Sequence, residues 1–294
     1  MAANTTTGSL ADSLETVIDG ARLVREYEGV VMRTTDKQTL PENTGLSWEE
    51  ISLAQLSAQL VTETTVLENP QQMSDSMITI TPLVSGINTV VTDRVYRRVS
   101  KKTIALMGKL AQNAMNRKKD EDYIATFAGA TTTLSGTGST LASGILSAAV
   151  SRINGNVTEP APSSGDIFAV LHPFQIKDIQ DEIVAGLGTY TIPTGMTADI
   201  FKQGMSGIDR VSGAAVFADG NIAINSTPDA RGAVHHRMAI VLVQGHGNRA
   251  TTRRREEIGG GADELFIYDE YALGERSAGN WLYGVLSDAT APTA

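Results

Sequence analysis

The chain has 294 residues, of which 41% are hydrophobic and only 5% aromatic, so any core must be built mainly from aliphatic side chains and methionine. This length allows one large domain or two small ones. The absence of cysteine excludes disulfides, thiolate metal sites and a cysteine nucleophile, and the net charge of −9 is unlike that of a free nucleic-acid-binding domain.

The N-terminal region predicts an arm. Residues 1–17 contain no basic region followed by an apolar stretch, so they do not read as a signal peptide. Residues 12–27 carry apolar residues at helical spacing, which predicts an amphipathic helix. No neighbouring element completes a compact unit with this helix, so we expect it to dock on another surface. No run of about 18 apolar residues occurs, so no membrane span is expected.

Residues 42–75 are polar, acidic and rich in turn-forming residues, with few positions that could anchor them in a core. A structureless segment of this length is uncommon inside a compact domain. We therefore expect either a disordered linker or an excursion that partners stabilise. Two extended segments follow, at 77–81, where isoleucine alternates with threonine, and at 88–92 after a turn at Gly86.

The strongest predicted element is a helix from about Ser100 to Phe127. Apolar residues recur along one side of it, and Ser100 is a suitable N-cap. At 1.5 Å per residue such a helix spans about 40 Å, more than a small domain, so we expect it to brace a flat, extended subunit. From Asp93 to Lys119 nine residues are basic and one is acidic, which makes a basic stripe on an otherwise acidic chain.

The rest of the chain alternates helices with strands. The pattern predicts helices at 141–153 and 173–184, the second opened by Pro173, and a short buried strand at 167–171. Further strand-like runs occupy 214–217, 222–224 and 238–244. Two charged strands at 253–258 and 264–268, joined by three glycines, predict a solvated or subunit-facing hairpin.

Motifs for catalysis or metal binding are not found in the sequence. The four histidines, His172, His235, His236 and His246, lack a metal-ligand spacing, and the adjacent pair would point to opposite faces of a strand. The glycines at 259–261 lack the phosphate-loop pattern, and no GxSxG elbow occurs. We therefore expect structural histidines and no cofactor. Asp120, Glu121 and Asp122 predict a solvated helix face with pairs to Arg117 and Lys118.

The order of these elements resembles the major capsid proteins of tailed bacteriophages, which have the Hong Kong 97-type fold. Residues 67–72 and the strand after them look like the tip and return strand of the family's extension loop. Thr92-Asp93-Arg94 and the following helix resemble the start of its spine helix, and 168–173 resembles the strand-to-helix step of its axial domain. Residues 271–274 and 283–285 look like closing strands of its peripheral domain. The resemblance covers about residues 12–288.

The resemblance implies a mixed α+β subunit with an N-terminal arm at 1–44 and an extension loop at 45–90. A peripheral domain would comprise 91–130 and 246–294, and an axial domain 131–245. Such subunits form hexamers and pentamers of an icosahedral shell around double-stranded DNA. The implied location is the virion, after assembly in the host cytoplasm. Expected partners are other copies of the chain, a separate scaffolding protein and a portal protein at one vertex, with a decoration protein as an optional addition.

The resemblance also suggests residue roles, each with an alternative. The extension loop should lie across the next subunit, where its acids could meet arginines of that neighbour, unless the loop is disordered; the candidates are Glu49, Glu50, Glu63, Glu68 and Asp75 with Arg253, Arg254 and Arg255. The basic stripe could contact DNA phosphates or pair with acids of neighbouring subunits; the candidates are Lys101, Lys102, Lys118 and Lys119. Two other identities stay open, an encapsulin-type nanocompartment shell protein and a soluble enzyme.

Overall fold

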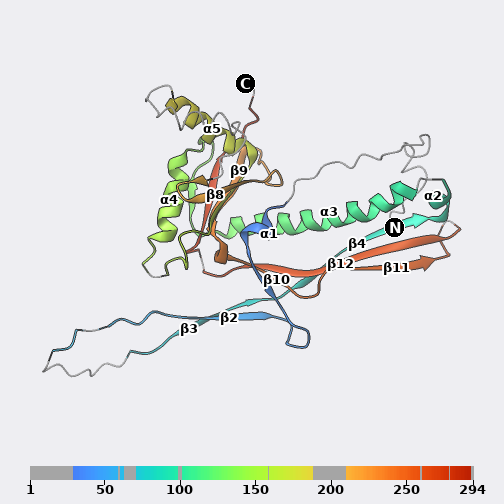
Figure 1. The fold of residues 1–294 in the computed structure, drawn as a ribbon, viewed down its shortest axis with the longest axis horizontal. Coiled ribbons are helices and arrows are strands. Elements are labelled where there is room, and N and C mark those ends of the chain that lie inside the picture. The colour runs from blue at the N-terminus through green and yellow to red at the C-terminus, as the bar shows by residue number, and fades with distance from the viewer. Residues whose placement is uncertain are drawn as a thin grey trace.

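A computed structural model describes residues 29–58, 60–62, 71–98, 101–157, 159–187, 210–258, 260–277 and 279–292. For 101–107 and 183–187 it describes the helical backbone without the side chains. The helix expected at 12–27 lies outside these ranges. Figure 1 shows an extended molecule with three parts: a compact α/β part, a long helix lying along a sheet, and a two-stranded ribbon that projects from the body.

The sheet under the long helix, here called the peripheral sheet, has five strands: β1 (Asp36–Thr39), β10 (Ile240–Gln244), β12 (Ala262–Glu275), β11 (Arg249–Arg255) and β4 (Leu83–Thr92). Strand β12 is central, because it pairs antiparallel with β11 and β10 along one edge and with β4 along the other. β1 joins β10 in parallel. The pairing of β11 with β12 confirms the predicted charged hairpin, whose turn includes Gly260 and Gly261 at φ of 81° and 109°.

The long helix α3 (Lys101–Thr126) confirms the predicted helix and lies along the peripheral sheet (Figure 1). A short helix, α2 (Asp93–Arg98), precedes it, so the basic stripe extends over two helices. Ala111 and Met115 of α3 pack against Ile267 of β12. Farther along the helix, the Tyr271 hydroxyl donates a hydrogen bond of 2.7 Å to Asp122 Oδ2. These contacts fix α3 over β12.

The second sheet, here called the axial sheet, has six strands in the order β5 (Thr133–Ser135), β13 (Leu282–Asp288), β9 (Asp229–His236), β6 (Ile167–Leu171), β8 (Ala214–Ala218) and β7 (Arg210–Val211). Helices α4 (Ser143–Asn154) and α5 (Pro173–Leu187) pack on one face, where Leu146 and Ile179 are fully buried. Tyr123 and Phe127, at the end of α3 and in the following turn η2 (Phe127–Gly129), pack on the other face. The predictions for α4, α5 and β6 are confirmed.

Three predicted features of the strands are corrected by the structure. Gly86 does not form a turn but lies inside β4, where a Cβ would be 2.8 Å from Cδ1 of Tyr268. The run 222–224 makes only an isolated bridge between Ile224 and Ala230, while the neighbouring strand β9 was not predicted. Residues 283–285 do not close the peripheral sheet, because β13 pairs with β9 and β5 in the axial sheet. Conversely, β10 belongs to the peripheral sheet.

Candidate subunit interface

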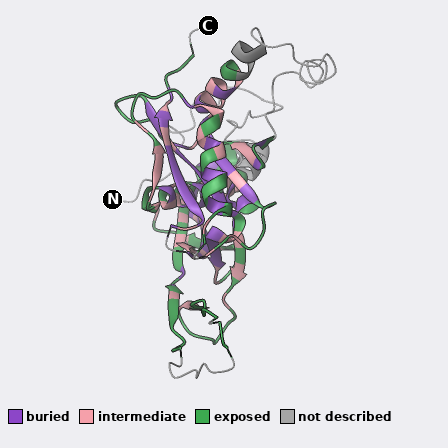
Figure 2. Cartoon of the chain, turned by 90° about the vertical axis from the view of Figure 1, so that its left-hand side faces the viewer, coloured by how far each residue is buried: buried purple, intermediate pink, exposed green. Residues whose placement is uncertain are grey.

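The projecting ribbon consists of β2 (Trp48–Leu53) and β3 (Asp75–Ile80), which pair antiparallel from Trp48 opposite Ile80 to Leu53 opposite Asp75. The pairing continues beyond the strands, where Ala54 N donates to Ser74 O at 2.9 Å and Ser57 N donates to Gln71 Oε1 at 2.8 Å. The described part of the segment expected to be a linker or an excursion therefore forms an excursion with its own strand pairing. Figures 1 and 2 show it extending away from both sheets.

Large apolar side chains on and next to the ribbon are exposed to water. Ile51 and Met77 lie directly opposite each other across the strands and are 62% and 59% exposed. Others with at least half of their surface exposed are Leu46, Leu53, Leu56, Leu60, Val61 and Met73. An isolated two-stranded hairpin is only marginally stable in water, and its free edges invite pairing with another chain. Exposed apolar side chains along a paired ribbon are typical of a surface that binds another molecule.

The root of the ribbon, by contrast, is tightly fixed to the body by Arg276, whose side chain is only 8% exposed. Its Nε donates to Glu50 Oε2 of β2 and its Nη2 donates to Asp36 Oδ2 of β1, both at 2.8 Å. Its Nη1 donates to Met238 O at 2.9 Å, and the guanidinium lies 5.9 Å from the centre of the Trp48 ring. One cation therefore joins the ribbon to the edge of the peripheral sheet.

A close apolar contact completes the ribbon root. Ile80, at the end of β3, is buried with Val241 and Val243 of β10. It lies across Gly274 of β12, where a Cβ would be 2.5 Å from Ile80 Cδ1. A larger residue at position 274 would force the Ile80 side chain to move. The direction in which the ribbon leaves the body is therefore set by packing and by an ion pair together.

The structure pairs several of the predicted interface residues within the subunit. Glu50 is bonded to Arg276, as described above. Arg254 makes a bidentate contact with Asp93, at 2.5 and 2.6 Å, and this guanidinium lowers the pKa of the Asp93 carboxyl below its ordinary value. Arg255 bonds to Glu257 at 2.8 Å and lies 3.5 Å from Glu264. These pairs lie within one subunit, and contact of Glu50, Arg254 and Arg255 with a neighbouring subunit remains a proposal.

The remaining predicted interface residues divide into two groups. Glu49 and Asp75 on the ribbon, and Arg253 on β11, are exposed and stay candidates for contact with a neighbouring subunit. Glu63 and Glu68 lie outside the described residues.

The basic stripe also separates into different environments. Lys118 is exposed and pairs with Asp122, and Arg117 lies 3.6 Å from Glu121, so the predicted helix pairs are confirmed. Lys119 is instead buried and forms an ion pair with Asp269 of β12, so we leave it out of the candidate DNA-facing residues. The side chains of Lys101 and Lys102 lie outside the description. Asp120 is fully buried, which corrects the prediction that residues 120–122 form a solvated face.

The histidines of the axial sheet have structural contacts. His235 is fully buried; its Nε2 lies 2.5 Å from the Tyr123 hydroxyl, and its Nδ1 lies 2.9 Å from the carbonyl oxygen of residue 236. Burial lowers the pKa of His235 to about 4, so its ring is neutral at physiological pH. The His236 ring instead lies 3.2 Å from the Ser163 hydroxyl. Each ring therefore has its own partners.

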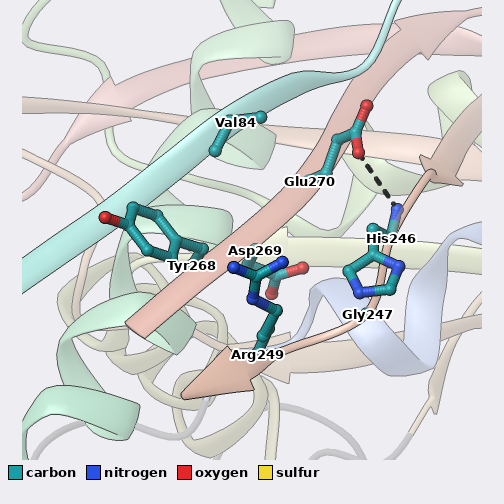
Figure 3. Close-up of a pocket in the computed structure, with 7 residues that line it drawn as sticks. All are labelled: Val84, His246, Gly247, Arg249, Tyr268, Asp269 and Glu270. Carbon is teal, nitrogen blue, oxygen red and sulfur yellow. Dashed lines mark hydrogen bonds between the residues drawn. The ribbon is translucent and has the colours of Figure 1, made fainter. Parts of the chain in front are cut away.

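The pocket in Figure 3 lies at the turn between β10 and β11, where it meets β4 and β12. Seven residues line it: Val84, His246, Gly247, Arg249, Tyr268, Asp269 and Glu270. The His246 amide donates to Glu270 Oε2 at 3.3 Å. This lining contains no serine, threonine or lysine that a histidine could activate as a nucleophile. Across the described ranges no group of three or more potential metal ligands is found, and no helix is long and apolar enough to cross a membrane.

The sequence did not reveal the residues that fix the ribbon root. Arg276 and Glu50 are separated by 226 positions. The need for glycine at position 274 is apparent only once Ile80 is seen to pack against it. One signal was present: Trp48 is the only aromatic residue between 42 and 75. A lone tryptophan at the start of an exposed acidic segment indicates a buried attachment point. The other members could not be identified without the fold.

Solved phage capsid structures share the fold of this chain. The head structure of Helicobacter pylori bacteriophage KHP40 aligns with a TM-score of 0.70 at 11% identity, covering 98% of this chain and 100% of that chain. The capsid of Ralstonia phage GP4 aligns with a TM-score of 0.69 at 11% identity, covering 95% and 96%. A chain of Mycobacterium phage Che8 aligns with a TM-score of 0.66 at 14% identity, covering 92% and 97%.

These likenesses are found in structure and not in sequence. No family model matches the chain, and no curated protein matches it significantly. At identities of 11% to 14% the alignments show the fold alone. They confirm the predicted fold class, the mixed α+β Hong Kong 97-type capsid fold, over nearly the whole chain.

Proposed function

We propose that this protein is the major capsid protein of a tailed bacteriophage. Copies of the chain would assemble into hexamers and pentamers that form an icosahedral shell around packaged double-stranded DNA. The virion is then its final location. The fold supports this proposal, since the capsid chains that it matches align along almost their entire length.

The observation that carries the proposal is the ribbon. It is fixed at its root by Arg276 and Gly274, yet its apolar side chains, such as Ile51 and Met77, face water in the single chain. Burying apolar surface stabilises an assembly by roughly 25 cal/mol per Å². A ribbon that is fixed at its root but exposes apolar side chains along its strands is expected when a second copy of the chain covers those side chains. An enzyme that acts as a monomer gains nothing from this arrangement.

The charge distribution supports a weaker proposal about DNA. We propose that Lys118, with Lys101 and Lys102 of the same helix, faces the packaged genome and contacts phosphates without reading sequence. The alternative is that these lysines pair with acids of neighbouring subunits. Lys118 already has Asp122 as a partner, but an exposed pair of this kind contributes little stability and can exchange for another anion.

The expected partners remain part of the proposal. Besides other copies of the chain, they are a separate scaffolding protein and a portal protein at one vertex, with a decoration protein as an optional addition. The main rival is an encapsulin-type shell, which has the same kind of fold but encloses enzymes and assembles without help. A soluble enzyme is the rival of another class, and the lining of the pocket in Figure 3 has no serine, threonine or lysine beside His246.

Electron microscopy of the purified protein tests the proposal. The chain is expressed alone and together with the candidate scaffolding protein of its own genome. We expect uniform closed shells with the scaffold, and irregular or few shells without it. Uniform shells from the chain alone that copurify with a bound enzyme would favour the encapsulin alternative. A stable monomer under both conditions would overturn the proposal.

A further inference from the structure

Two buried carboxyl groups lie where three parts of the chain meet. Asp120 is on α3, and Asp219 directly follows β8 of the axial sheet; both are fully buried. The third part is the segment at residues 29–31, which leads into α1 (Val31–Thr34) and begins the described chain. Neither acid belongs to the ribbon or its root.

Asp120 bonds to both of the other segments. Its Oδ1 accepts hydrogen bonds from the amides of Val30 and Val31, at 2.9 and 3.4 Å. Its Oδ2 accepts one from Asn221 Nδ2, at 2.8 Å, in the loop after β8. At Gly29 a Cβ would lie 2.6 Å from Asp120 Oδ1, so only glycine lets the chain pass this close. One carboxylate thus fastens two distant segments to α3.

Asp219 adds a second carboxyl group to the same place. Its Oδ1 accepts a hydrogen bond from the backbone amide of Asn221 at 2.9 Å, while the side chain of Asn221 donates to Asp120, so one asparagine binds both carboxyl groups. The buried Oδ2 of Asp219 has no hydrogen-bond partner among the described residues. Two buried carboxylates that bind the same asparagine cannot both be ionised without a large cost, so we infer that the pair retains one shared proton. Burial and the contact with Asp120 raise the pKa of Asp219 to about 7.

Other titratable groups lie near the pair. Tyr123 of α3 is one of them, and burial together with the charges of Asp120 and Asp219 raises the pKa of its hydroxyl. That hydroxyl contacts Thr34 of α1 and the neutral His235 of β9. Lys119, the residue before Asp120, is engaged by Asp269. Burial and Asp120 raise the pKa of Asp219, and the hydrogen bond from the Asn221 amide opposes this rise.

We propose that Asp120 and Asp219 form a proton-dependent contact that fastens residues 29–31 and the loop 219–221 to α3. With one proton shared, the two carboxyl groups attract and the three segments stay together. When that proton leaves, two negative charges face each other in a buried site and the contact loosens. The axial sheet and the start of α1 then become freer to move relative to α3. This property is independent of what the shell encloses.

The direction of the pH dependence follows from the proton balance. The closed contact retains its proton up to about pH 7, whereas an exposed Asp219 loses it near 3.8. Between these values the closed form binds more protons than the open form, so raising the pH favours opening by about tenfold per pH unit. Above about pH 7 both forms are ionised and the dependence levels off. His235, which loses its proton on burial, works in the opposite direction below pH 6.5.

Hydrogen–deuterium exchange of the full-length protein, kept in one assembly state, tests the proposal. The amides of Val30 and Val31 report on the contact because both bond to Asp120. Asp219→Asn replaces the shared proton with an amide donor and has nearly the same shape. We expect the ratio of protection, variant over wild type, to rise about tenfold per pH unit between about pH 5 and 7. Forming this ratio cancels the contribution of His235.

Asp181→Asn is the matched control, because Asp181 is exposed on α5 and its loss changes the net charge equally. A protection ratio that stays constant with pH for Asp219→Asn, or that rises equally for Asp181→Asn, would overturn the proposal. If Asp219→Asn does not fold, infrared spectroscopy of the wild type decides. A protonated-carboxyl band present near pH 6 and lost near pH 8.5 supports the shared proton, and its absence near pH 6 contradicts it.

Discussion

Arg276 and Glu50 form a 2.8 Å ion pair although 226 positions separate them in the sequence. The pair joins the end of the longest strand of the peripheral sheet to the first strand of the ribbon. Because Arg276 also bonds Asp36 of β1, a single side chain ties together three segments. These bonds within the subunit therefore set the direction in which the ribbon leaves the body of its own subunit.

Replacing Arg276 with methionine should misdirect the ribbon. The change keeps most of the side-chain volume but leaves Asp36 and Glu50 without their cation. Both acids are partly exposed, so we expect a loss of about 2 kcal/mol in the free energy of unfolding, less than for a fully buried pair. Urea unfolding and electron microscopy of assembly products measure the two effects. Arg152→Met, which removes an exposed arginine from α4, should leave both unchanged, and equal behaviour of the two variants would refute the role of Arg276.

Gly274→Ala should displace the ribbon root. The added methyl group would lie 2.5 Å from Ile80 Cδ1, and overpacking of this kind costs about 1–3 kcal/mol. The penalty should shrink in an Ile80→Ala background, where the clashing atoms are gone. A double-mutant cycle on unfolding free energies measures this coupling. If the two changes are simply additive, the contact does not set the ribbon position.

Changing Ile51 and Met77 together to serine should separate folding from assembly. Both side chains are exposed in the single chain, so the free energy of unfolding should change by no more than about 0.5 kcal/mol. Shell formation should be lost, because the surface they bury against a neighbour is gone. Val157→Ser is the control, since Val157 is 89% exposed but lies away from the ribbon. Normal shells from the double variant would argue that the ribbon is not an interface.

Lys119 and Lys118 are adjacent, but their replacement by methionine should have different effects. Lys119→Met leaves the buried Asp269 without its cation and should cost about 3 kcal/mol of unfolding free energy. Lys118→Met removes an exposed pair and should cost less than about 0.5 kcal/mol. Urea unfolding distinguishes them. If the Lys118→Met variant both assembles normally and packages DNA as well as the wild type does, the proposed DNA contact is wrong for that residue.

His235 should make the fold sensitive to acid. Its pKa is about 4 in the folded chain and 6.5 when exposed, so the unfolded state binds more protons between these values. Stability is therefore fully present above pH 6.5 and falls as the pH drops through 4, by up to about 3 kcal/mol. His235→Gln keeps an acceptor for Tyr123 without this titration. Thermal unfolding across the window should show a shallower acid slope for the variant; identical slopes would exclude His235 as the cause.

Helices and buried strands were predictable because their signal is local. The spacing of Ala111, Met115 and Phe127 along one side of α3 is visible in the sequence, and so is the apolar run of β6. Strand β9 was missed because charged, glycine and histidine residues break its apolar pattern. Yet Gly232 belongs there, since a Cβ would lie 2.5 Å from Val170 O. Tertiary packing overrides local propensity at such positions.

The candidate interface was predictable in outline but not in its contacts. The acidic, turn-rich composition of 42–75 indicated a segment that needs a partner, and the structure gives it a paired ribbon. The charged residues could not be assigned from sequence, because pairs such as Arg254 with Asp93 join positions 161 apart. The burial of Asp120 and Lys119 could not be predicted either, because their partners are also distant in the sequence and both residues look solvated in their helix.

Cryo-electron microscopy of assembled shells tests the central claim most directly. The measurement is the position of the ribbon, residues 48–80, relative to the subunits around it. We predict that it lies on a neighbouring subunit, with Ile51 or Met77 buried at that contact and Arg276 still bonded to Glu50 of its own chain. A ribbon that folds back on its own subunit, or that projects into solvent in a closed shell, would contradict the account.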